Sequence, residues 1–175
     1  MRKILIVVDM QNDFINGALG SQEAVGIVDN VHAKITEYDP ADVIFTRDTH
    51  HEDYLQTQEG RNLPVEHCIE GTDGWQIRSE LAAAAPEAMI FDKPTFGSTE
   101  LADYVGKLYD ELNGELEVEV IGLCTDICVI SNALLLKAER PEMQISLDPA
   151  CCAGVTPEKH AAAIEAMASC QIRIL

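Results

Sequence analysis

The sequence is poor in basic residues and has no long apolar run. Of its 175 residues, 12 are lysine or arginine and 30 are aspartate or glutamate, so the formal charge is −18 at pH 7. Such an acidic chain repels phosphate backbones and anionic headgroups, so we expect neither nucleic acid nor a membrane as a partner. No stretch approaches the roughly 20 apolar residues of a membrane span, and no signal-peptide cleavage site follows the N-terminus. The expected location is therefore the cytoplasm.

The six cysteines lack the spacing of a redox pair or of a four-cysteine zinc site. Three residues, not two, separate Cys124 from Cys128. In a reducing compartment such cysteines stay free thiols. The adjacent Cys151 and Cys152 are expected to fill a corner between a strand and a loop, with a strained disulfide between them as the alternative.

Apolar runs typical of strands alternate with helical patterns along the whole chain. The expected strands are 3–9, 42–47, 88–92, 117–122, 143–147 and 171–174. The expected helices are 22–38, 76–85, 98–112, 126–139 and 157–169. This alternation predicts an α/β fold, one domain over residues 1–175, with a mainly parallel six-stranded sheet and helices on both faces. Residues 48–75 form a long irregular stretch, and loops of that length are usually functional.

Three segments place a reactive side chain near the C-terminal end of an apolar run, where ligands bind in open parallel sheets. Asp9 and Lys93 each end such a run, and Cys128 follows a strand that ends at Gly122. Cys128 is expected in the first turn of a helix, where unpaired N–H groups and the helix dipole stabilise a thiolate. A thiolate is nucleophilic, so covalent catalysis is one interpretation of Cys128. The alternative is a buried, small apolar residue, the usual role of a free cysteine.

Together these segments resemble the isochorismatase-like cysteine hydrolases and, within them, the nicotinamidase/pyrazinamidase branch. The match extends from residue 4 to about residue 156 and rests on the segments 9–14, 93–98, 122–128, and 48–50 with 63–68. The resemblance implies the doubly wound strand order 3-2-1-4-5-6. In that order the first and fourth strands are neighbours at the point where a cleft opens.

The resemblance also implies a catalytic triad of Asp9, Lys93 and Cys128. Asp9 would accept the thiol proton, and Lys93, lying between two anions, would lower the pKa of both. The backbone N–H groups of Cys124 and Cys128 would form the oxyanion hole for a tetrahedral intermediate, with a cis peptide bond before Cys124. No histidine is near Cys128 in the sequence, and His160 is expected to be an exposed surface residue.

The long loop resembles the metal loop of nicotinamidases. Asp48, His50 and His67 are the expected ligands, and Glu59 is chosen as the fourth because it follows Asp48 by the spacing of the glutamate-using members. His51 is the alternative fourth ligand. Such a set suits one divalent ion, zinc in the first place, with manganese or iron as alternatives. The other interpretation is an acidic surface loop that binds no metal.

One departure from the branch concerns the substrate ring. Nicotinamidases usually carry a tryptophan near the start of the segment that ends in His67, but the chain has Leu63 there. Phe14 and Leu63 are expected to sandwich a flat ring, and Trp75 is expected to pack at the start of a helix.

The predicted activity is the hydrolysis of a small planar amide, most simply nicotinamide to nicotinate and ammonia through a thioester, a step of NAD salvage. Another small amide is the alternative substrate. A metal-binding regulatory module without turnover is the alternative function. True isochorismatases lack a cysteine nucleophile, so Cys128 argues against their chemistry. The sequence is compatible with a homo-oligomer but does not determine the oligomeric state.

Overall fold

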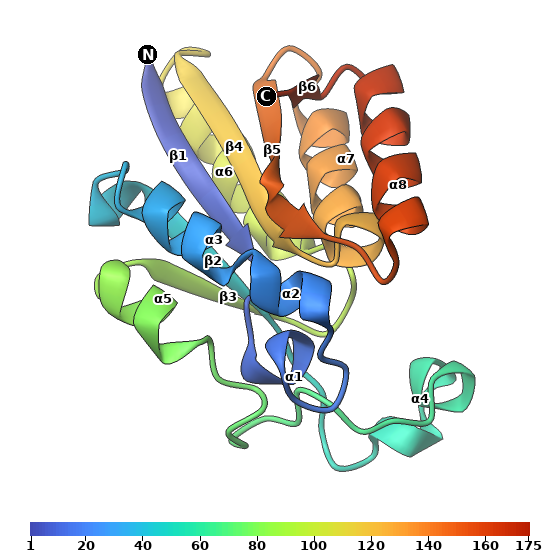
Figure 1. Ribbon diagram of the computed structural model, residues 1–175. Coiled ribbons are helices and arrows are strands. Elements are labelled where there is room, and N and C mark those ends of the chain that lie inside the picture. The colour runs from blue at the N-terminus through green and yellow to red at the C-terminus, as the bar shows by residue number, and fades with distance from the viewer.

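Six strands form one sheet in the computed structural model, which describes residues 1–175. Their order is β3-β2-β1-β4-β5-β6 and every neighbouring pair is parallel. The predicted doubly wound α/β sheet is therefore confirmed (Figure 1). The strands are β1 Arg2–Val8, β2 Val43–Asp48, β3 Met89–Lys93, β4 Leu116–Leu123, β5 Gln144–Ala153 and β6 Arg173–Ile174.

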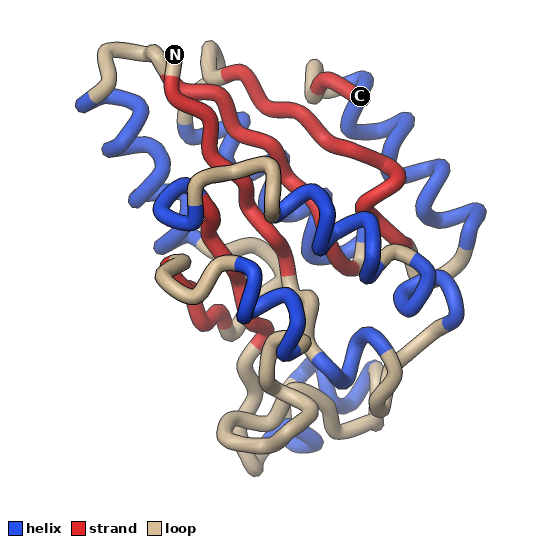
Figure 2. Tube along the Cα trace, turned by 60° about the vertical axis from the view of Figure 1, so that its left-hand side comes forward, coloured by secondary structure: helices blue, strands red, loops and turns tan.

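Helices cover both faces of the sheet, and the strands run between these two layers (Figure 2). On one face α3 packs against α5, and on the other α6 packs against α7, which in turn packs against α8. The helices are α1 Asn12–Ile15, α2 Gln22–Gly26, α3 Val28–Ile35, α4 Gln58–Asn62, α5 Ser79–Ala84, α6 Thr99–Glu111, α7 Ile130–Glu139 and α8 Pro157–Ser169. A membrane span would need a longer and more apolar helix than any of these.

The core lies on both faces of the two central strands, β1 and β4. The segment from Ile4 to Val8 is at most 1% exposed along its whole length. Such an uninterrupted apolar run is typical of a parallel strand covered by helices on both faces. The charged residues of β1, Arg2 and Lys3, lie at its exposed start, and Asp9 follows directly after its buried carboxyl end.

Two of the expected helices differ in their bounds, and the expected helix 126–139 begins with a π-helical turn, Thr125–Val129, before α7. The expected helix 22–38 is divided into α2 and α3, because Gly26 ends α2 and Ile27 joins the two. Glycine has a low helix propensity, which makes this position a natural break. The expected helix 76–85 begins only at Ser79.

The long stretch 48–75 and the end of β5 are more ordered than predicted. The stretch contains a 3-10 turn, Tyr54–Gln56, and the short helix α4. β5 continues to Ala153, beyond the expected end at residue 147, so Cys151 and Cys152 lie buried in a strand rather than in a corner. Both are free thiols, as are the other four cysteines.

Gly122 allows β4 to approach β1 closely near the candidate site. Its φ is +117°, and a Cβ at this position would overlap the carbonyl oxygen of Val8. Only glycine adopts such a conformation without strain. The sequence after Gly122 can therefore turn over the end of β1, next to Asp9.

Candidate active site

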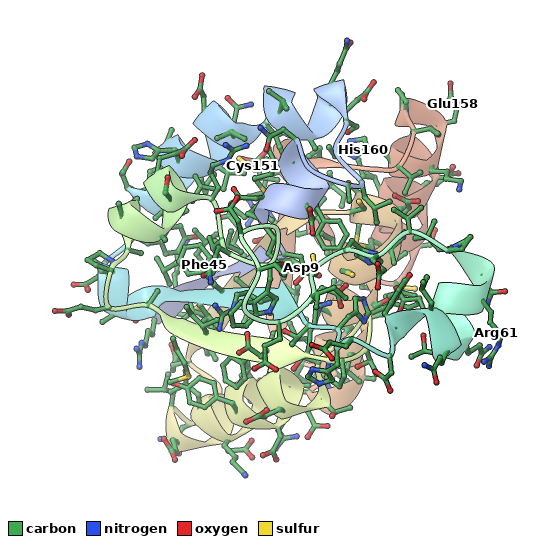
Figure 3. The ribbon with its side chains drawn as sticks, turned by 90° about the horizontal axis from the view of Figure 1, so that it is seen from below. Asp9, Phe45, Arg61, Cys151, Glu158 and His160 are labelled. Atoms are coloured by element: carbon green, nitrogen blue, oxygen red, sulfur yellow. The ribbon has the colours of Figure 1, made fainter.

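The structure brings Asp9, Lys93 and Cys128 together at the carboxyl edge of the sheet. Asp9 follows β1, Lys93 ends β3, and Cys128 lies in a π-helical turn, Thr125–Val129, between β4 and α7. Lys93 Nζ is 2.7 Å from Asp9 Oδ2 and 3.4 Å from Cys128 Sγ. All three residues are buried, and Asp9 is central when the molecule is seen from below (Figure 3). The lysine therefore bridges the carboxylate and the sulfur.

Thr46 holds the other oxygen of the Asp9 carboxylate. Its hydroxyl donates to Asp9 Oδ1 at 2.6 Å and accepts from the Asp9 backbone N–H at 3.2 Å. With Lys93 on Oδ2, the carboxylate is fixed from two sides. The sequence analysis missed Thr46, although a polar residue inside the apolar strand β2 was a usable signal.

Burial dominates the titration of this group of residues. It raises the pKa of Asp9, although Lys93 opposes the shift. Burial and then Asp9 raise the pKa of the Cys128 thiol well above its usual value, and Lys93 only partly opposes them. Burial alone would lower the pKa of Lys93, but Asp9, Cys128 and Asp48 together raise it.

Lys93 does lower the pKa of Asp9 and of Cys128, as expected, but burial outweighs it and leaves both pKa values raised. The helix terminus was visible in the sequence, but the desolvation of the sulfur was not, and desolvation disfavours the charged form. The raised pKa of Cys128 favours the neutral thiol, and the raised pKa of Lys93 favours its cation. The carboxylate, with its raised pKa, is a stronger base than a free aspartate.

The backbone around Cys128 is held by Asn132, which the sequence analysis also missed. Asn132 Nδ2 donates to the Cys128 carbonyl oxygen at 2.8 Å, and its Oδ1 accepts from the Ser98 N–H at 2.9 Å. The peptide bond between Leu123 and Cys124 is cis, as expected. The N–H groups of Cys124 and Cys128 stand at the start of a helical segment, where backbone donors have no partner inside the helix.

A second cluster lies beside the first. One ligand-type atom from each of Asp48, His50, Glu59 and His67 lies within 4.8 Å of the others, so these four side chains could hold a metal ion. His51 is largely exposed and its Nδ1 lies 3.3 Å from Glu70, away from the cluster. Of the two alternatives for a fourth ligand, the structure brings Glu59 into the group and leaves His51 outside.

The orientation of the two imidazoles fits a metal. His67 Nδ1 lies 2.8 Å from the Val65 carbonyl oxygen, which can only accept, so Nδ1 carries the proton and Nε2 presents a lone pair. His50 Nε2 is buried without a hydrogen bond, because its 2.9 Å contact with Asp48 Oδ2 lacks hydrogen-bond geometry. Two imidazole nitrogens and two carboxylates form a donor set that suits zinc.

Asp48 connects the two clusters. Its Oδ1 lies 3.5 Å from Lys93 Nζ, while its Oδ2 faces His50 and His67. Burial alone would raise the pKa of Asp48, but the two histidines and Lys93 hold it well below its usual range. The pKa of Glu59 is raised, by burial and then by the charge of Asp48.

A family model described as the isochorismatase domain matches residues 3–175. The chain belongs to the isochorismatase family. Among curated proteins it is 25% identical to the nicotinamidase/pyrazinamidase of Mycobacterium tuberculosis, over 99% of this chain and 98% of that protein. It is 28% identical to an uncharacterized isochorismatase family protein of Bacillus subtilis, over 77% of this chain and 78% of that protein.

Solved structures of the isochorismatase family agree with this assignment. The pyrazinamidase of Pyrococcus horikoshii in complex with zinc is similar with a TM-score of 0.82 and 29% identity, covering 99% of this chain and 98% of that one. A nicotinamidase/pyrazinamidase of Bacillus subtilis gives a TM-score of 0.82 and 28% identity over 99% of each chain. In both comparisons the structural similarity covers at least 98% of each of the two chains.

Two residues that the sequence analysis missed hold the metal-type cluster of this isochorismatase domain. The Gln11 side-chain amide donates to the carbonyl oxygens of Asp48 and Trp75 and accepts from the Asp48 N–H. Tyr54 is fully buried, its ring lies against His50 and His67, and its hydroxyl donates to the Leu63 carbonyl oxygen at 2.9 Å. An aromatic residue inside an otherwise polar loop was the available signal for Tyr54.

Two expectations about single residues are wrong. Trp75 precedes α5 by several residues and packs in the loop, where its Nε1 donates to Thr49 Oγ1 at 2.9 Å and the Arg47 guanidinium lies 3.6 Å from its ring centroid. His160 is half-buried rather than exposed, because its Nδ1 makes a 2.8 Å hydrogen bond with Thr125 Oγ1. This contact ties α8 to the turn that carries Cys128.

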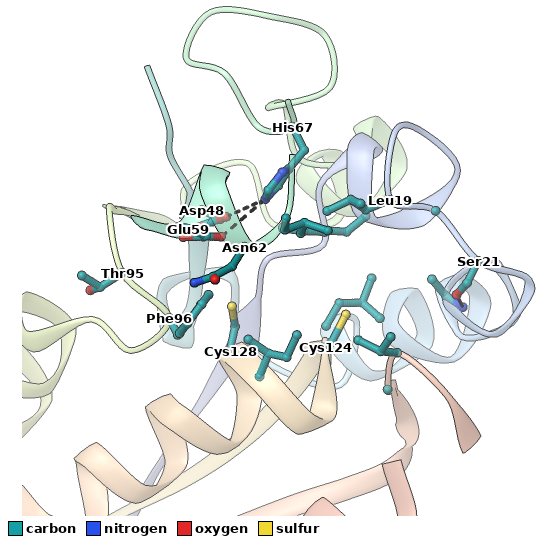
Figure 4. A pocket seen from close by; sticks show the side chains of 18 of the residues that line it. Leu19, Ser21, Asp48, Glu59, Asn62, His67, Thr95, Phe96, Cys124 and Cys128 are labelled. Carbon is teal, nitrogen blue, oxygen red and sulfur yellow. Dashed lines mark hydrogen bonds and ion pairs between the residues drawn. The ribbon is translucent and has the colours of Figure 1, made fainter. Parts of the chain in front are cut away.

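Members of both clusters line one cavity of about 780 Å³, namely Cys128 of the first and Asp48, Glu59 and His67 of the second. Cys128 and Cys124 direct their sulfurs toward it, with Asp48, Glu59 and His67 across from them (Figure 4). Phe14 and Leu63 also line it. The sequence analysis did not find Phe96, which lies beside Cys128 in this cavity and is 45% exposed (Figure 4).

Proposed function

We propose that this protein is a cysteine amidohydrolase that converts nicotinamide to nicotinate and ammonia through a thioester on Cys128. One observation carries the proposal. Lys93 Nζ lies 3.4 Å from Cys128 Sγ and 2.7 Å from Asp9 Oδ2, and Cys128 lines a cavity that Asp48, Glu59 and His67 also line. The names of the Mycobacterium tuberculosis, Pyrococcus horikoshii and Bacillus subtilis relatives, nicotinamidase or pyrazinamidase, support the same activity.

The first half of the reaction forms the thioester. Asp9 takes the thiol proton as Cys128 Sγ attacks the amide carbon, so the thiolate exists only at the moment of attack. The backbone N–H groups of Cys124 and Cys128 stabilise the oxyanion. Asp9 then gives the proton to the leaving nitrogen, the C–N bond breaks, and ammonia departs.

The second half releases the acid. Asp9, again a carboxylate, accepts a proton from water, and the resulting hydroxide attacks the thioester carbon. The C–S bond breaks and the sulfur recovers the proton from Asp9, which leaves a carboxylic acid and the free thiol. Lys93 keeps its charge throughout and holds Asp9 and the sulfur in place, because its pKa is raised by the anions around it.

The ring of the substrate lies between Phe14 and Leu63 in this proposal. Asp48, His50, Glu59 and His67 would hold a zinc ion, which supplies, when bound, a Lewis-acid contact for the ring nitrogen. The bond from His67 Nδ1 to the backbone fixes the imidazole that faces the ring. The ring centroids of Phe14 and His67 are 5.5 Å apart. Phe14 would therefore contact the same part of the substrate ring that His67 faces.

The setting that we propose is a cytoplasmic enzyme that takes a small amide and has neither nucleic acid nor a membrane as a partner. The formal charge of −18 supports the exclusion of polyanions. Nicotinate formation would place the enzyme in NAD salvage.

Ammonia release from a panel of amides tests the proposed function. Purified protein loaded with zinc is expected to release ammonia from nicotinamide and pyrazinamide, and much more slowly from benzamide, which lacks the ring nitrogen. An aliphatic amide serves as the control without a ring. Failure to turn over any heteroaromatic amide would refute the proposal, and stoichiometric metal without turnover would favour a metal-binding module instead.

A further inference from the structure

The cavity has two ends that differ in chemistry. Asp48, Glu59 and His67 lie at one end, and Leu19 and Ser21 lie at the opposite end, with the two cysteines between (Figure 4). Cys128 is nearer the first end and Cys124 nearer the second (Figure 4). A ring that reaches both Cys128 and the metal-type cluster therefore leaves the second end open.

This second end is apolar, and we name it the apolar end. It is defined by side chains from α2 and the segment before it, from the π-helical turn, and from the segment after β5: Leu19, Ala24, Ile127 and Val155. No charged side chain of the cavity lining comes from these segments. Such a lining recognises an apolar group by removing it from water.

The polar groups nearest the apolar end already have partners within the protein. Ser21 Oγ accepts from the Ala24 N–H at 3.0 Å as the cap of α2. Asp126 Oδ1 accepts from the Val155 N–H at 2.9 Å. These bonds fix the backbone on both sides and leave the side chain of Val155, which is 47% exposed, facing the cavity.

The cavity volume also exceeds what one small ring needs. Cavities of about 300–1,000 Å³ hold ligands of drug size, and this one measures about 780 Å³. A pyridine ring with one carboxamide group is much smaller than such ligands. Val155 is 47% exposed, so a ligand group that covers it would remove apolar surface from water.

We propose that the apolar end is a substrate subsite and that the preferred substrates are heteroaromatic carboxamides bearing an alkyl or aryl group. The group would point away from Asp48, Glu59 and His67 and contact Leu19 and Val155. This inference rests on the proposed function, because it takes the amide carbon to lie at Cys128.

The test compares nicotinamide with nicotinamides that carry methyl, propyl or phenyl groups at ring carbons 4, 5 or 6. At one of these positions kcat/KM is expected to rise with the size of the group, by about tenfold or more, since a buried methylene in an apolar pocket changes kcat/KM by at least that factor. If nicotinamide is the best substrate in the whole series, the subsite is wrong.

The variant Val155→Asp places a charge at the apolar end. The ratio of kcat/KM for the best substituted amide to that for nicotinamide is expected to fall by about tenfold or more. Val25→Asp is the matched control, because Val25 on α2 is 50% exposed and does not line the cavity. The control should keep the wild-type ratio, and an equal fall in both variants would overturn the proposal.

Binding measured without turnover separates the two proposals. Calorimetry on Cys128→Ala, with and without Val155→Asp, gives the ratio of the Kd values of substituted and unsubstituted amides. If this ratio depends on Val155 but the wild-type protein hydrolyses no amide, the subsite stands and the proposed activity is refuted. If the wild-type protein hydrolyses nicotinamide but the ratio of Kd values is near one with and without Val155→Asp, the activity stands and the subsite is refuted.

Discussion

The two ionisable clusters of the cavity are built in different ways. Asp9 and Lys93 lie at the ends of β1 and β3, Cys128 lies in the π-helical turn after β4, and each is at most 5% exposed. The metal-type cluster takes Asp48 from the end of β2, but its other members lie along one loop, and the Glu59 side chain is 25% exposed. The first cluster is fixed by the sheet and the second by local contacts of the loop.

The clusters also differ in how their charge is balanced. The first contains its own cation, because Lys93 lies between Asp9 and Cys128. The second has two carboxylates and two imidazoles, and the only fixed cation near it is the same Lys93, 3.5 Å from Asp48. Changes in the first cluster should therefore affect chemistry and stability, and changes in the second should affect metal and substrate binding.

The largest expected effect is that of Cys128→Ala. Removing a nucleophile costs several orders of magnitude, so ammonia release from nicotinamide should fall by about ten-thousandfold or more. Cys124→Ala is the control and should stay active, because only the backbone N–H of Cys124 is used. A Cys128→Ala variant that keeps more than about a tenth of the wild-type rate would place the nucleophile elsewhere.

Lys93→Met should destabilise the fold as well as stop turnover. It leaves Asp9 buried without its cation, and breaking a buried ion pair from one side costs about 3–5 kcal/mol of the free energy of unfolding. Urea denaturation measures this change. Adding Asp9→Asn to Lys93→Met should restore much of the lost stability, because no unpaired buried charge remains.

Lys107→Met supplies the comparison for Lys93→Met, since Lys107 pairs with Asp103 on the exposed surface. Exposed pairs contribute little to stability, so its unfolding curve should match the wild type. Equal stability of Lys93→Met and Lys107→Met would contradict the assigned role of the buried lysine.

A smaller effect is expected in the metal-type cluster. His50→Ala and His67→Ala should each lose bound zinc and raise KM for nicotinamide by about tenfold or more, with Cys128 still alkylated by iodoacetamide at the normal rate. Elemental analysis and steady-state kinetics measure these changes. Glu59→Ala should lose less zinc and raise KM less than the histidine variants. His51→Ala should change neither zinc content nor KM appreciably. Loss of zinc in His51→Ala with full retention in Glu59→Ala would contradict the ligand set.

The smallest predicted effect concerns His160 and pH. Burial lowers the pKa of His160, with Asp126 opposing the shift, so just below pH 6.5 the folded protein binds fewer protons than the unfolded chain. The neutral His160 imidazole therefore contributes fully to the free energy of unfolding above about pH 6.5. This contribution is lost as the pH falls through the lowered pKa of His160.

His160→Gln removes this titration while keeping a side chain that can bond to Thr125. Urea midpoints at pH 7.5 and pH 5.5 should differ less in His160→Gln than in the wild type. The same pH dependence in both proteins would show that His160 does not contribute.

The sequence predicted the elements and the triad better than the contacts that support them. An apolar run that ends in a charge, as at Asp9, can be recognised from neighbouring residues alone. Thr46, Gln11 and Asn132 each bond to a partner at least 34 positions away, and no local pattern encodes such pairs. The helix start at Cys128 was visible, but the burial that raises the pKa of its thiol depends on the whole fold.

The most direct test of the account is to trap the covalent intermediate. Zinc-loaded protein is mixed with nicotinamide, quenched in acid during turnover, digested and examined by mass spectrometry. The account predicts a nicotinoyl thioester on the peptide that contains Cys128, and none on this peptide in Cys128→Ala. A nicotinoyl group on another residue, or turnover by Cys128→Ala at the wild-type rate, would contradict it.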